Sequence, residues 1–138
     1  MTTSTAPPDW VPAGDPREHL EEVITAFGQT FGSTAQGVWS APGRVNLIGE
    51  HLDYNGGPVL PVAIGHRTLV GAAVRSDRRV RLVSRQDSAT WEGSLDDLRP
   101  GRLTGWSAYA AGVLWATREN GHEVPGIDLL VDGRVPVG

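Results

Sequence analysis

Ala41-Pro-Gly-Arg-Val-Asn-Leu-Ile-Gly-Glu-His-Leu-Asp-Tyr-Asn-Gly-Gly57 is the stretch that most narrows the fold of this 138-residue chain. Short runs of strand-forming residues lie on either side of Pro42-Gly43. This pattern predicts a strand over residues 38–41, a tight turn, and a second strand over residues 45–48. Charged side chains and further glycines follow, so we expect a polar, glycine-rich turn after the second strand.

The polar side chains of this run suggest a binding site. Arg44 carries a planar set of donors that suits phosphate or carboxylate oxygens, and Glu50 and Asp53 can accept from sugar hydroxyls. His51 can donate or accept, and the glycines leave the backbone open to a ligand. A surface ion pair remains an alternative. One imidazole with two carboxylates lacks the closed ligand set of a zinc site, so we predict no metal here.

The segments around the run predict an α+β domain. Apolar residues recur at helical spacing from Asp15-Pro16 to Phe27, before Gly28 and Gly32, which predicts a short helix. Strands are predicted over residues 60–74, 79–84, 89–92 and 127–132, and a second helix over residues 106–120. Strands and helices do not alternate regularly, so we expect one mixed or antiparallel sheet covered by a helix. Residues 1–15 are rich in Thr, Ser, Ala and Pro and are expected to form a flexible arm.

The sequence also predicts the surroundings of several side chains and of the last strand. The arginines at positions 75, 78, 79, 81 and 85 are expected on a solvated strand face. His19 and the other histidines outside the run are expected to be surface or packing residues. The strand over residues 127–132 is followed by no closing element, so we expect it to lack a partner. One sheet face should then expose apolar surface, which predicts marginal folding or self-association.

Composition excludes several classes of protein. The net charge of −4, without a basic run interleaved with aromatic residues, argues against nucleic-acid binding. The absence of cysteine excludes disulfides and thiolate chemistry. No apolar run approaches the roughly 20 residues that cross a bilayer, and no signal-peptide pattern is present, so we expect no membrane association and a cytoplasmic location.

The run from Gly43 to Tyr54 resembles the galactokinase signature, with every position that the signature fixes filled correctly. The similarity extends from about Phe27 to the end of the chain. Galactokinases are GHMP kinases, and the resemblance implies ATP-dependent phosphorylation of galactose at its anomeric hydroxyl, giving galactose 1-phosphate. It also implies that residues 16–138 form an incomplete N-terminal domain similar to the second domain of ribosomal protein S5.

The resemblance assigns roles to individual residues. Glu50, His51, Leu52 and Asp53 resemble the galactose-binding residues of the family, and Leu52 stands where the family usually has Thr. Arg44 resembles the arginine near the reacting oxygens, which implies transition-state stabilisation. Trp106 and Gly138 are candidate nucleotide-binding residues. Trp106 resembles the aromatic beside adenine, although its helical spacing equally suits a core residue. Gly138 resembles the first glycine of the phosphate-binding loop.

The family's phosphate-binding loop continues beyond Gly138, so the resemblance implies ATP and Mg²⁺ as cofactors whose main binding loop lies outside this sequence. We therefore expect the isolated polypeptide to be inactive unless the missing C-terminal part acts as its partner. Two alternatives remain, a non-catalytic galactose-binding or sensor module and an orphaned gene fragment.

Overall fold

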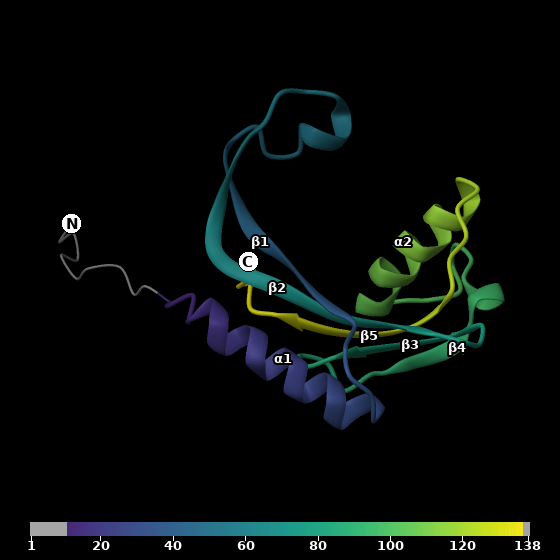
Figure 1. The fold of residues 1–138 in the computed structure, drawn as a ribbon. Coiled ribbons are helices and arrows are strands. Elements are labelled where there is room, and N and C mark those ends of the chain that lie inside the picture. Colours follow the sequence, from purple (N-terminus) through teal and green to yellow (C-terminus); the bar gives the residue numbers. More distant parts are fainter. Residues whose placement is uncertain (1–10, 137–138) are drawn as a thin grey trace, which may run out of the picture.

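The computed structural model describes residues 11–136 and contains one five-stranded sheet with a helix on each face (Figure 1). The α-helices and strands, in chain order, are α1 (Pro16–Phe31), β1 (Gly37–Ile48), β2 (Leu60–Arg75), β3 (Arg79–Ser84), β4 (Trp91–Ser94), α2 (Trp106–Glu119) and β5 (Gly126–Gly133), and short 3-10 helices span Asp53–Asn55 and Leu95–Asp97. The strand order is β1-β2-β5-β3-β4, and only β3 and β5 pair in parallel. The predicted α+β class and mixed sheet are confirmed. Most of the predicted arm and Gly138 lie outside the described residues.

The two helices form where local signals predict them. The side chain of Asp15 accepts a hydrogen bond from the backbone N–H of Arg17 at 2.8 Å, and α1 ends at Gly32 with a φ of 68°. Helix α1 covers one face of the sheet and α2 covers the other (Figure 1). Each helix closes its own core. The core under α1 contains Val23, Phe27, Leu69, Ala73 and Leu130, and the core under α2 contains Val80, Leu82, Leu95, Leu98 and Ala111.

Strand β5 lies in the middle of the sheet, so the expectation that the last strand lacks a partner is wrong. It pairs antiparallel with β2 and parallel with β3. Helix α2 lies in the crossover connection from β4 to β5, which returns the chain to the sheet between β2 and β3. The sequence pattern of β5 carries no information on this order, because the partners are set by the crossover.

Residues 37–48 form one continuous strand, so the predicted turn at Pro42-Gly43 is also wrong. Strand β1 pairs with β2 along its length, with a register irregularity between Pro42 and Arg44. Because β1 is at the edge of the sheet, a proline there is tolerated. A Cβ atom at Gly43 would lie only 2.7 Å from Cγ1 of Val135. The Pro-Gly pair therefore marks a bulge that the chain packs against closely, and not a reversal.

Two of the arginines expected in solvent instead pair with a buried aspartate. Asp128 of β5 is buried on the face that α1 covers. Arg81 donates to both carboxylate oxygens of Asp128, from Nε to Oδ1 at 2.6 Å and from Nη2 to Oδ2 at 2.6 Å. Arg75 Nη1 also donates to Oδ1 of Asp128, at 3.1 Å. Arg78 and Arg79 do lie at the surface, where they form exposed ion pairs.

A second buried aspartate of β5 connects the sheet to α1. Asp132 accepts from Arg85 Nη1 at 2.6 Å and from Gln86 Nε2 at 2.5 Å. His19 of α1 is buried beside it, with Nε2 at 3.2 Å from Oδ2 at an angle that does not make a hydrogen bond. His19 is therefore a packing residue, as expected, but one that faces a carboxylate.

Burial raises the pKa of Asp128, but hydrogen bonds from Arg81 and Arg75 outweigh it and hold the pKa below its ordinary value. The same competition lowers the pKa of Asp132, where Gln86 and Arg85 supply the opposing contacts. Both carboxylates are therefore ionised near neutral pH.

Apolar side chains are exposed over β1, the adjoining half of β2 and one side of α2, although β5 is paired and each face of the sheet carries a helix. They are Trp39, Val45, Leu47, Ile48, Leu60, Val62, Tyr109 and Val113. Self-association through this surface stays a prediction. None of the helices within residues 11–136 combines the length and the apolar character required to cross a membrane.

Replacing Asp128 with Asn should lower the free energy of unfolding by about 3 kcal/mol at pH 7, because two guanidinium groups lose their buried counter-charge. Asp96→Asn is the matched control, because Asp96 pairs with Arg78 at the exposed surface. That variant should leave the stability nearly unchanged. Urea unfolding followed by circular dichroism measures both.

The same comparison has a defined pH dependence. A carboxyl whose pKa is lowered in the folded state stabilises the protein above its unfolded pKa of about 3.9, and this contribution is lost as the pH falls through the folded value. The stability difference between wild type and Asp128→Asn should therefore be full at pH 7 and shrink below about pH 4. A difference that stays constant down to pH 3 would contradict the ion-pair assignment.

Candidate functional site

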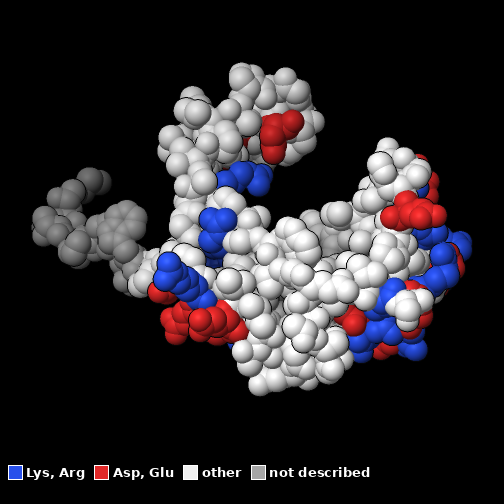
Figure 2. All heavy atoms as spheres, in the orientation of Figure 1, with Lys and Arg blue, Asp and Glu red and all other residues white. Residues whose placement is uncertain are grey.

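The predicted sugar-binding residues Glu50, His51, Leu52 and Asp53 lie on the loop between β1 and β2, at the end of a curved arm, and Arg44 lies on β1 before it (Figure 1). Only residues 68–75 of β2 pair with β5, whereas residues 60–63 pair with β1 alone. This half of the hairpin carries the loop away from the body of the sheet. Figure 2 shows the molecule hollowed between the loop and the side where α2 lies, with acidic side chains on the loop and basic ones below it.

Short-range hydrogen bonds give the loop its shape. The N–H of Leu52 donates to the carbonyl of Gly49 at 3.0 Å, and the N–H groups of Asn55 and Gly57 donate to the carbonyl of Leu52 at 3.0 and 2.9 Å. Gly49 has a φ of 96°, and a Cβ atom there would lie 2.6 Å from the carbonyl oxygen of Pro58. Only glycine suits this position.

Arg44 and Asp53 face each other across the base of the loop. Nη2 of Arg44 lies 4.0 Å from Oδ2 of Asp53, and their side chains are 67% and 44% exposed. An exposed pair at this distance contributes little to stability. Both groups therefore remain available to a ligand, one as a donor and the other as an acceptor.

Glu50 is oriented by a residue on the preceding strand. Nδ2 of Asn46 donates to Oε2 of Glu50 at 2.9 Å. The contact fixes the carboxylate through one oxygen, and the other oxygen can accept from a ligand.

His51 is held by two neighbours. It is the one non-glycine residue with positive φ among residues 11–136, at 64°. Tyr54 Oη lies 2.6 Å from its Nδ1, and Asn55 Nδ2 donates to its carbonyl at 2.8 Å. Sequence reasoning gave no role to Asn46, Tyr54 or Asn55, although all three lie within the quoted run. Spacing alone does not show which side chains meet.

Trp106 lies away from the loop, at the start of α2. Its Nε1 donates to the carbonyl of Ala89 at 3.1 Å, and its half-buried ring packs in part against the core under α2. The packing alternative is therefore correct for part of this ring. The structure does not bring Trp106 into contact with the loop residues.

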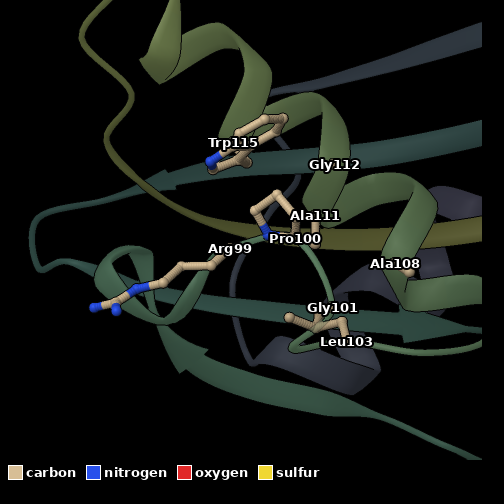
Figure 3. Close-up of a pocket in the computed structure, with 8 residues that line it drawn as sticks. All are labelled: Arg99, Pro100, Gly101, Leu103, Ala108, Ala111, Gly112 and Trp115. Atoms are coloured by element: carbon tan, nitrogen blue, oxygen red, sulfur yellow. The ribbon is translucent and has the colours of Figure 1, made fainter.

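The flank of α2 carries a cavity of about 240 Å³, away from the loop (Figure 3). It is lined by Arg99, Pro100, Gly101, Leu103, Ala108, Ala111, Gly112 and Trp115. In Figure 3 the guanidinium of Arg99 points away from the helix, so small and apolar groups form the wall. The lining contains none of the predicted site residues. Across residues 11–136 no three His, Asp or Glu side chains converge as metal ligands.

Solved structures that align with this chain include GHMP kinases. The mevalonate kinase of Methanococcus jannaschii aligns with a TM-score of 0.60 at 15% identity, over 74% of this chain and 33% of that one. The galactokinase of Lactococcus lactis, solved with galactose, aligns with a TM-score of 0.73 at 35% identity, over 86% of this chain and 32% of that one. These alignments show that the chain shares the fold of this part of the GHMP kinases.

The sequence is similar to the galactokinases. Residues 25–74 match the galactokinase galactose-binding signature. The galactokinase of Streptomyces coelicolor is 47% identical over 113 residues, which are 81% of this chain and 29% of that protein. That of Ligilactobacillus salivarius is 42% identical over 115 residues, 81% and 30% of the two chains. The chain is a relative of the galactokinases and spans about 30% of their length.

Replacing Gly49 with Ala should open the loop, because the new methyl group meets both an unfavourable φ and the carbonyl of Pro58. We expect a local cost of about 2 kcal/mol, which speeds amide hydrogen exchange at Leu52 roughly 30-fold. Gly56→Ala is the matched control in the same loop, because its φ is also positive but nothing lies within 4 Å. It should cost about 1 kcal/mol, or roughly fivefold faster exchange. Equal effects of the two variants would argue against the contact with Pro58.

Proposed function

We propose that this chain binds galactose through its β1–β2 loop and supplies the sugar-binding part of a galactokinase. The observation that carries the proposal is the grouping of Arg44, Glu50, His51 and Asp53 on one short, locally ordered segment. The match to the galactokinase galactose-binding signature and the 35% identity to a galactokinase solved with galactose support it.

The proposed contacts follow from the chemistry of each side chain. The carboxylates of Glu50 and Asp53 accept from galactose hydroxyls, and His51 adds a ring nitrogen. Leu52 offers a half-exposed apolar side chain to a C–H face of the sugar, while its backbone closes the turn.

The proposed reaction transfers the γ-phosphoryl group of ATP to the anomeric oxygen of galactose. The anomeric hydroxyl loses its proton, its oxygen bonds to the γ-phosphorus, and the bond from that phosphorus to ADP breaks, which gives galactose 1-phosphate and ADP. Arg44 stabilises the negative charge on the reacting oxygens. We assign the proton acceptor to no described residue.

Two residues of the chain are proposed to contact the nucleotide. We propose that the exposed part of the Trp106 ring contacts adenine, since a flat aromatic surface suits a purine. Gly138 remains a proposed phosphate contact outside the described residues. Mg²⁺ is the proposed metal cofactor, and in such sites it is held by one or two carboxylates together with the substrate phosphates. No three His, Asp or Glu side chains converge within residues 11–136, and we assign none of them as its ligand. We place residues 16–138 in the family's N-terminal domain and the protein in the cytoplasm.

Calorimetric titration of the 138-residue chain with galactose should show saturable binding that Asp53→Ala weakens about tenfold, because a charge-assisted hydrogen bond is lost. Glu123→Gln is the control, because it removes a carboxylate outside the loop. No heat at millimolar galactose and no shift in melting temperature would contradict the proposal.

The alternative functions are separated by an assay of ATP consumption with galactose on the same preparation. Turnover above a no-enzyme control that depends on Arg44 would establish kinase activity in this polypeptide. Binding without turnover would favour the galactose-binding module, or a kinase whose activity also needs the part of the relatives that this chain does not span. Neither binding nor turnover would favour the orphaned fragment.

A further inference from the structure

We propose that Tyr54 is a positioning residue for the sugar site. Its hydroxyl donates to Nδ1 of His51 and fixes the imidazole as the tautomer that carries its proton on Nε2. That N–H then donates to a hydroxyl of galactose. The inference deepens the proposed function and rests on it for the identity of the ligand.

The backbone of His51 is held in an uncommon conformation. Its φ of 64° lies in the left-handed region, which a residue with a Cβ atom seldom adopts. Asn55 stabilises it by donating to the His51 carbonyl at 2.8 Å. Strained residues held by their surroundings cluster at functional sites. The contact fixes where the imidazole leaves the backbone.

The ring itself is held by Tyr54. The phenol oxygen lies 2.6 Å from Nδ1, and the two rings meet edge to face with centroids 6.0 Å apart and planes 67° apart. A neutral imidazole has one donor and one acceptor nitrogen, and the hydrogen bond at one nitrogen sets the role of the other. If the phenol donates to Nδ1, Nε2 must carry the proton.

The neighbouring groups support this direction of the hydrogen bond. Glu50 and Asp53 are acceptors only, so a sugar hydroxyl that gives its proton to one of them still has free lone pairs on its oxygen. An Nε2–H group on His51 supplies the matching donor. Arg44 is the other donor of the group and is 4.0 Å from Asp53. The loop then offers donors and acceptors in balance.

Tyr54→Phe tests the proposal because it removes only the hydroxyl, and Tyr109→Phe is the matched control. Tyr109 is the other tyrosine of the chain and is 82% exposed on α2. Imidazole ¹⁵N spectra of the free protein report the tautomer, and His51→Asn identifies the signals of His51. We expect wild type and Tyr109→Phe to show unprotonated Nδ1, and Tyr54→Phe to show a mixture of tautomers. The Kd for galactose should rise about fivefold in Tyr54→Phe alone, with the melting temperature unchanged.

Two results would overturn the proposal. One is a wild-type His51 that carries its proton on Nδ1 or shows both tautomers. The other is an unchanged galactose affinity in Tyr54→Phe beside a wild type that binds. A wild type that binds no galactose would refute the proposed function and the role toward the sugar together. The ¹⁵N spectra need no sugar, so they would still decide whether Tyr54 sets the tautomer.

Discussion

The buried contact of Asp128 with Arg75 and Arg81 is the constraint on which the rest of the fold depends. Asp128 is opposite Arg81 in the parallel pair of β5 and β3, and Arg75 reaches it from β2. A shift of one residue in either pairing would turn the carboxylate to the other face of the sheet, away from both guanidinium groups. A buried carboxylate without a partner costs several kcal/mol. One side chain therefore fixes the register of the three central strands.

That register determines where the candidate site lies. With Arg75 held at the end of β2, the strand is long enough that its first residues, from Leu60, run past β5 and pair with β1 only. The loop at the end of this arm relies on its own hydrogen bonds for its shape. Its side chains are oriented by neighbours a few residues away, such as Asn46 and Tyr54. Different residues therefore stabilise the sheet and orient the side chains of the loop.

The sequence predicted the features that depend on local signals. Both helices form where spacing and capping indicate them, and the signature run indicated the similarity to galactokinases because its residues are contiguous. The predictions from sequence that were wrong concern contacts between distant parts of the chain. The Pro42-Gly43 pair is typical of a turn, but only the sheet order shows that it lies in an edge strand. The arginines of β3 alternate like a solvated face, whereas the partner of Arg81 is 47 residues further on. The role of Tyr54 likewise needed the loop's three-dimensional shape.

The central claim is that the loop between β1 and β2 is a galactose site. A titration of ¹⁵N-labelled protein with galactose, followed by the shifts of its amide signals, tests this most directly. We predict saturable shifts concentrated in residues 44–54, with the amides of residues 108–115 at the cavity on α2 unchanged. Shifts centred on that cavity, or none along the loop at saturating sugar, would contradict the account.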